Sequence, residues 1–62
     1  MNSERCVEFA FKLDDQALRW EALLPELGSE DERQGLKFLI DRARAEAKIY
    51  FHLSELYRAK GV

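Results

Sequence analysis

The chain has 62 residues, of which 47% are hydrophobic and 35% are charged, and its formal net charge is −2. This length allows a single small domain, and one core of that size rarely supplies more than about 3–5 kcal/mol. The single cysteine, Cys6, excludes an internal disulfide, and the acidic charge argues against a general affinity for nucleic acid or anionic membranes. We therefore expect self-association to supply additional stability.

The start of the chain, M-N-S-E-R-C, lacks the apolar core of a signal peptide, and the longest apolar run covers only residues 38–40. That run is far shorter than the ~20 residues that a membrane-spanning helix needs. We predict a soluble cytoplasmic protein with no membrane partner, in which Cys6 stays reduced.

The charges are divided unevenly between the two halves of the chain. Residues 1–32 contain nine acidic and three basic side chains, a balance of −6, whereas residues 33–62 contain seven basic and three acidic ones, a balance of +4. The halves should attract each other, either within one chain or between antiparallel chains.

Large apolar residues alternate with other residues over positions 5–13, which predicts a half-buried β-strand or an extended arm. A lone strand cannot satisfy its own backbone N–H and C=O groups, so this strand would pair with a second chain. A helical pattern also runs through Phe9, Leu13 and Ala17, and it favours instead a helix that begins after Ser3. The large side chains of the alternation are Val7, Phe9, Phe11 and Leu13.

A first helix is predicted over residues 14–24. Asp14 or Asp15 can cap its free N–H groups and interacts favourably with the positive end of the helix dipole. Apolar residues recur at helical spacing as far as Leu24, and Pro25 disfavours helical geometry beyond that point. Residues 25–28 should form the turn.

A second helix is predicted over residues 30–60. Ser29 and Glu32 match the capping-box pattern S-x-x-E, and Gly61 suits the left-handed conformation that often ends a helix. Such a helix is about 45 Å long, and the first helix offers only about 10–14 residues to cover it. An apolar overhang past residue 48 is therefore expected, and it should be buried against a partner.

These elements define a mainly α fold in one domain over residues 1–62, assembled as a homodimer. An N-terminal strand or extended arm precedes a two-helix hairpin with a long second helix. The alternative is a plain α-hairpin that dimerises as a four-helix bundle. Large apolar side chains are typical interface anchors, whereas Trp20 is expected in the core. The predicted partner or dimer interface consists of Val7, Phe9, Phe11, Ile49, Tyr50, Phe51, Leu53, Leu56 and Tyr57.

Four basic side chains of the second helix recur at spacings of 4, 7 and 4 and so share one face. They form either an anionic docking surface or an ordinary solvated face. These residues are Arg33, Lys37, Arg44 and Lys48.

His52 and Glu55 lie three residues apart and could contribute to a metal site across a dimer, although a surface histidine beside a helical ion partner is the simpler interpretation. The sequence has no glycine-rich phosphate loop and no recognisable nucleophile–base set. We therefore expect no enzymatic activity and no cofactor.

The segment V-E-F-A-F-K-L-D-D-Q-A-L, residues 7–18, resembles the strand-to-helix junction of the ribbon-helix-helix repressors. The resemblance implies strands from two chains paired in the DNA major groove, with Glu8, Ala10 and Lys12 facing the bases. The sequence departs from that pattern, because bases are normally read by Arg, Lys, Asn or Gln, and the acidic residues 30–32 would repel phosphate. The hairpin outline is also similar to small two-helix adaptors that dimerise into four-helix bundles.

We therefore predict a small non-enzymatic protein-binding module that acts as a homo-oligomer and binds another protein as an adaptor, inhibitor or assembly factor. The alternative is a dimeric DNA-binding transcriptional regulator of the ribbon-helix-helix type. A third hypothesis is a metal-binding dimer.

Overall fold

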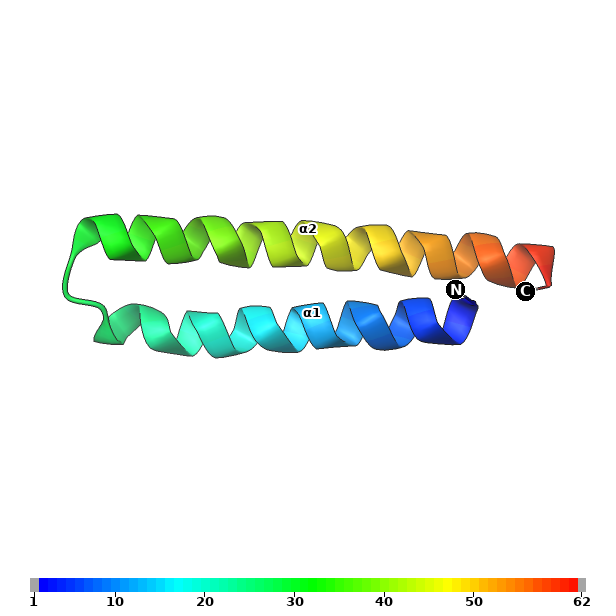
Figure 1. The fold of residues 1–62 in the computed structure, drawn as a ribbon, viewed down its shortest axis with the longest axis horizontal. Helices are drawn as coiled ribbons and strands as arrows, with labels where there is room; N and C mark the ends of the chain where they lie inside the picture. The colour runs from blue at the N-terminus through cyan, green and yellow to red at the C-terminus, as the bar shows by residue number, and fades with distance from the viewer. Residues whose placement is uncertain (1, 62) are drawn as a thin grey trace.

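The computed structural model describes residues 2–61, which form an antiparallel helical hairpin (Figure 1). Helix α1 spans Ser3–Leu23 and has 21 residues, a short 3-10 helix η1 spans Leu24–Glu26, and helix α2 spans Glu30–Lys60 and has 31 residues. The hairpin is long and thin, with extents of 48 × 14 × 12 Å. It is the plain α-hairpin that the sequence offered as the alternative fold.

The strand predicted for residues 5–13 is wrong, because these residues form the first turns of α1, and no strand occurs in residues 2–61. Asn2 caps this helix, since its side-chain oxygen accepts a hydrogen bond of 2.9 Å from the backbone N–H of Arg5. Helical hydrogen bonds satisfy the backbone within the segment, so the backbone needs no second chain. The side chains that become buried are Cys6 and Ala10, which the alternating pattern had placed on the opposite face.

The early start of α1 also corrects two further expectations. Asp14 and Asp15 lie inside the helix instead of capping it, and the Asp15 carboxylate pairs with Arg19 at 3.0 Å. The resemblance to ribbon-helix-helix repressors loses its first element, because the segment that would enter the major groove is helical.

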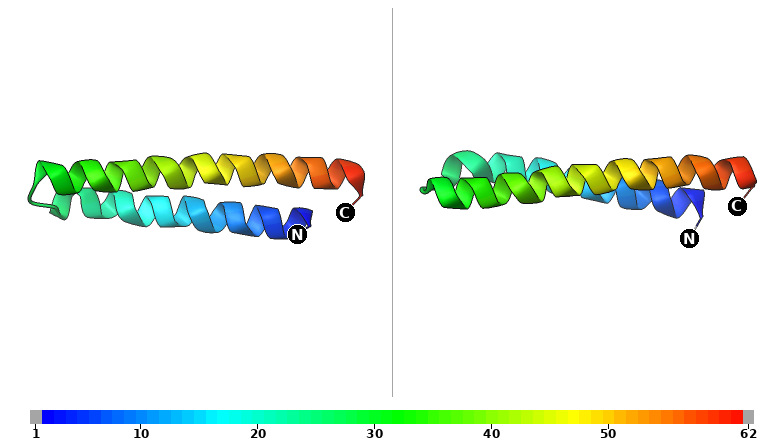
Figure 2. Two further views of the ribbon diagram at one scale, coloured as in Figure 1. Left: turned by 45° about the horizontal axis from the view of Figure 1, so that its top comes forward. Right: turned by 90° about the horizontal axis from the view of Figure 1, so that it is seen from above.

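The expected overhang of α2 is mostly covered, because α1 is much longer than the predicted 14–24 helix and runs beside α2 in Figure 1 and in the left view of Figure 2. The added turns of α1 meet the segment of α2 that follows residue 48. The Phe9 and Tyr50 rings have centroids 4.9 Å apart, and the Phe11 and Phe51 rings meet edge to face at 5.4 Å. Any need for a partner must therefore come from the sides of the hairpin.

The turn and both ends of α2 follow the prediction. Helix α1 ends at Leu23, and Pro25 lies beyond it in η1. Because Pro25 lies outside the α-helix, its lack of an N–H costs α1 no hydrogen bond. At the other end Gly61 adopts the left-handed conformation with φ 77°, and its N–H bonds to the carbonyls of Arg58 and Tyr57.

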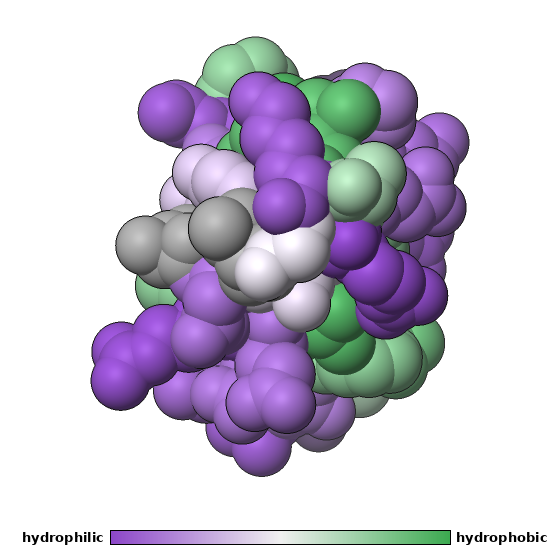
Figure 3. Space-filling model, turned by 90° about the vertical axis from the view of Figure 1, so that its right-hand side faces the viewer, coloured by the Kyte–Doolittle hydropathy of each residue, from purple (hydrophilic) through white to green (hydrophobic). Residues whose placement is uncertain are grey.

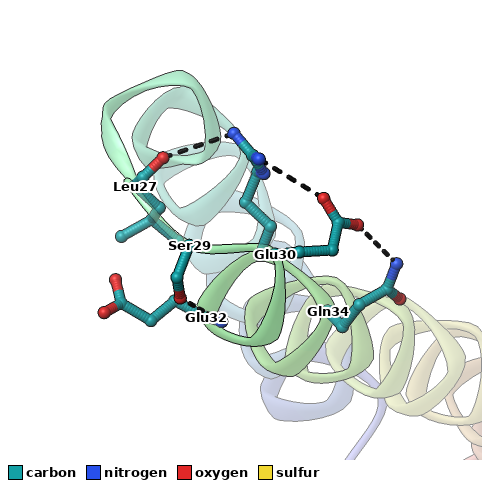
Figure 4. A network of polar contacts seen from close by, with 6 residues as sticks. Leu27, Ser29, Glu30, Glu32 and Gln34 are labelled. Carbon is teal, nitrogen blue, oxygen red and sulfur yellow. Dashed lines mark hydrogen bonds and ion pairs between the residues drawn. The ribbon is translucent and has the colours of Figure 1, made fainter.

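The start of α2 is held by a polar network (Figure 4). The Ser29 hydroxyl accepts a hydrogen bond of 3.1 Å from the Glu32 backbone N–H, which confirms the predicted cap. The Glu30 carboxylate accepts a hydrogen bond of 3.0 Å from the Gln34 amide and pairs with Arg33 at 3.3 Å. The Gln34 hydrogen bond, followed by the Arg33 charge, lowers the pKa of Glu30, so the carboxylate stays ionised beside the positive end of the helix dipole.

The two helices meet along one seam whose residues recur at alternating spacings of three and four. This heptad period keeps one stripe of each helix facing its neighbour and is typical of left-handed coiled-coil packing. Every seam residue is buried or half-buried. The seam consists of Ser3, Cys6, Ala10, Leu13, Ala17, Trp20 and Leu24, opposite Leu36, Ile40, Ala43, Ala47, Tyr50, Ser54 and Tyr57.

Replacement of Ser29, the N-cap of α2, tests how much this cap contributes to the stability of the hairpin. We expect Ser29→Ala to lower the free energy of unfolding by about 1 kcal/mol, because the Glu32 N–H loses its acceptor. Ser29→Asn keeps an accepting side chain and should leave stability nearly unchanged. Urea unfolding followed by circular dichroism measures both variants, and an equal loss in the two would contradict the capping role.

Candidate interaction surface

The buried part of the seam is made mainly of small side chains. Six hydrophobic residues are buried, and four of them are alanines. Small residues let two helices approach closely, but an alanine methyl group removes little apolar area from water. The six are Cys6, Ala10, Ala17, Ile40, Ala43 and Ala47.

One end of the hairpin holds the main cluster of the core. Ala17, Ile40 and Ala43 pack together there, and three larger side chains cover them: Trp20, Leu24 and Leu36. The prediction of Trp20 as a core residue is thus met in part, since its side chain packs against the cluster while remaining half-exposed.

Most of the large apolar side chains lie outside the seam. Scattered exposed apolar residues are ordinary, but eight large ones on so small a hairpin leave much apolar area in water. The end view in Figure 3 shows hydrophobic surface beside both helices, between hydrophilic side chains. The eight are Phe9, Phe11, Leu18, Leu23, Phe38, Leu39, Ile49 and Leu56, and their exposed fractions run from 43% to 65%.

One side of the seam carries a row of apolar side chains that Arg42 and Glu46 interrupt. Two neighbouring shallow grooves on this side share Glu46 as a lining residue, so they form one trough along the hairpin. Phe9 joins this side through its contact with Tyr50, and Leu56 joins it because it lies one heptad after Ile49. We call this surface the apolar flank: Phe9, Leu13, Trp20, Leu39, Ile49, Leu53 and Leu56.

The opposite side of the seam is lined mainly by charged side chains. An ion pair between Arg44 and Glu21 crosses from α2 to α1 on this side, as expected from the opposite charges of the two halves of the chain. Two of the grooves found over residues 2–61 lie along it, and acidic, basic and apolar side chains line them, the apolar ones being Val7, Leu24 and Ile40. We call this surface the charged flank: Glu4, Glu8, Glu21, Lys37, Asp41, Arg44 and Arg58.

The structure divides the predicted interface residues among three places. Four belong to the apolar flank, namely Phe9, Ile49, Leu53 and Leu56. Two others, Tyr50 and Tyr57, are half-buried in the seam. Val7 lines a groove of the charged flank, and the contacting pair Phe11 and Phe51 lies on that same side.

Three members of the apolar flank lie outside the predicted interface, namely Leu13, Trp20 and Leu39. Leu39 is the exposed one among them. It lies 14 residues, or two heptads, before Leu53, and it lines the same trough as Trp20 and Leu13. The sequence contains this spacing of 14 residues. It could be assigned to the apolar flank only once the structure showed that the neighbouring stripe of α2 faces α1.

The predicted anionic docking face is partly occupied by contacts within the chain. Arg33 pairs with Glu30 and donates to the Leu27 carbonyl at 3.4 Å, and Arg44 pairs with Glu21. Lys37 lines the same groove as Arg44, and Lys48 is exposed. These contacts favour the ordinary solvated face that the sequence left open.

The remaining candidate sites lie on the outside of α2. His52 and Glu55 are both exposed, and no group of three or more His, Cys, Asp or Glu side chains within residues 2–61 is placed to hold a metal ion. Neither of the two helices over this range combines the length and the apolar character needed to cross a bilayer. Comparisons of the chain with known protein families, with curated proteins and with solved structures gave no match.

A pair of matched substitutions tests the close packing of the seam. Ala47 is 1% exposed, and Ala47→Leu should cost about 1–3 kcal/mol of unfolding free energy because the larger side chain forces the helices apart. Ala45→Leu places the same side chain on the exposed face of the same helix and should change stability little. Chemical denaturation compares them, and equal stabilities would show that the seam is not tightly packed.

Proposed function

We propose that this chain is a small non-enzymatic protein-binding module that acts as a homo-oligomer. The observation that carries the proposal is that four of the six buried apolar residues over residues 2–61 are alanines, whereas eight large apolar residues are exposed. Complete burial of a large apolar side chain is worth about 1.5–3 kcal/mol, and the hairpin alone realises only part of this at eight positions. Contact with another protein surface is the most direct way to bury these side chains and gain the remaining free energy.

The size of the chain supports the same proposal. A hairpin of two helices has only one contact between helices. This single seam cannot bury both sides of α2. Helices of bundles usually have two apolar stripes, one for each neighbour. Here the second stripe lies on the apolar flank and has no neighbour within the chain.

A role as an adaptor, inhibitor or assembly factor fits a module with two unlike sides. Self-association can use the apolar flank, while the charged flank stays available to a second protein whose charges complement it. We further propose a cytoplasmic location, since the single cysteine cannot form an internal disulfide and is buried in the seam.

Mass measurement in solution tests the proposal. Light scattering coupled to size-exclusion chromatography at micromolar concentration should give at least twice the monomer mass of 7.3 kDa. The mass should fall toward that of the monomer on dilution, as mass action requires. A single monomeric species at every concentration would contradict a homo-oligomer.

A further inference from the structure

We infer that the apolar flank is the surface on which a second copy of this chain docks, giving an antiparallel four-helix bundle in which the two α2 helices lie side by side. The inference rests on the proposed self-association and assigns it a surface and an orientation. Three properties of the hairpin carry it: its excess of exposed area, the spacing of the stripe on α2, and the arrangement of two charges within that stripe.

The accessible surface of the hairpin is larger than that of a typical folded chain of its mass. It measures 4765 Å² for 7.3 kDa. The usual scaling with mass gives about 4,200 Å², so roughly 600 Å² is in excess. A standard interface buries about 800 Å² on each partner. The excess is therefore close to what one dimer interface of ordinary size would remove.

The stripe of α2 on the apolar flank has the spacing of a second coiled-coil seam. Its positions recur at three and four residues, offset by one position from the seam that faces α1. A helix with two such stripes is suited to contact two neighbours at once. The stripe consists of Leu39, Arg42, Glu46, Ile49, Leu53 and Leu56.

Two opposite charges make the part of this stripe over residues 39–49 complementary to itself. Arg42 and Glu46 already pair within the helix at 3.3 Å and are one turn apart. If two copies of α2 run antiparallel about a two-fold axis between these positions, Arg42 faces the partner's Glu46 and Leu39 faces the partner's Ile49. A parallel arrangement would instead place like charges opposite each other, which is unfavourable.

The charged flank is a poorer surface for a second copy. The grooves on that side are lined by acids and bases, and the Arg44 and Glu21 pair already crosses it. Burial of such groups costs desolvation energy unless each finds a partner. Exposed apolar residues lie on that side too, including Leu18 and Phe11, which contacts Phe51.

Two substitutions of equal exposure on opposite sides test the assignment. Ile49 is 58% exposed on the apolar flank, and Leu18 is 59% exposed one heptad after Phe11 on the other side. Sedimentation equilibrium of the full chain should show that Ile49→Glu weakens the dimer by about a hundredfold, roughly tenfold for each copy. Leu18→Glu should leave the dissociation constant within about threefold of the wild-type value.

A pair of charge-reversal variants provides a second test if the Ile49→Glu variant unfolds when its dimer dissociates. Arg42→Glu and Glu46→Arg should each weaken self-association, because each variant places like charges across the two-fold axis. An equimolar mixture of the two variants should recover a dimer containing one copy of each, since opposite charges then face each other between chains. Native mass spectrometry distinguishes this mixed dimer from the two homodimers when one variant is isotope-labelled.

The possible results distinguish an error in the assigned surface from an error in the proposed self-association. A dimer that is insensitive to Ile49→Glu, dissociates with Leu18→Glu, or shows no preference for the mixed pair would overturn the assignment to the apolar flank while leaving self-association intact. A wild-type chain that stays monomeric would overturn both and would leave the flank to a different protein.

Discussion

The close approach of α1 and α2 along a seam of small residues is the constraint on which the rest of this structure depends. Ala10, Ala17, Ala43 and Ala47 occupy positions where most hairpins place leucine or isoleucine, so the helices can run side by side with little between them. Most of the large apolar residues lie beside this seam, and Ile40 is the largest apolar side chain buried in it. The same packing that brings the helices together therefore leaves eight large apolar side chains exposed by 43–65%.

This arrangement gives the hairpin two unlike sides, and its proposed role follows from the difference. The apolar flank offers a trough lined by Leu39, Ile49 and Leu53, whereas the opposite side carries an ion pair between the helices and a mixture of acids and bases. A second copy on the apolar flank would complete a four-helix bundle, in which α2 contacts α1 through one stripe and its symmetry mate through the other. The charged flank would then remain on the outside of the assembly.

The parts of the fold that were predictable from the sequence are those fixed by local signals. Pro25, Ser29 and Gly61 each restrict the backbone through their own chemistry, so the turn and the bounds of α2 could be placed in advance. The start of the first helix was left open between Ser3 and Asp14 or Asp15, because its large residues happen to alternate over positions 5–13 while the buried residues, Cys6 and Ala10, are small. A search for hydrophobic periodicity gives most weight to the large apolar side chains. In this hairpin the close contact between the helices buries small side chains instead.

We propose that the hairpin depends on a second chain to bury its apolar flank, and the dependence of its stability on protein concentration tests this most directly. Thermal unfolding followed by circular dichroism over about a hundredfold range of concentration measures this, because only an associating protein unfolds at a concentration-dependent midpoint. The midpoint should rise steadily with protein concentration. A midpoint that stays constant over the whole range, with the helices intact at the lowest concentration, would contradict it.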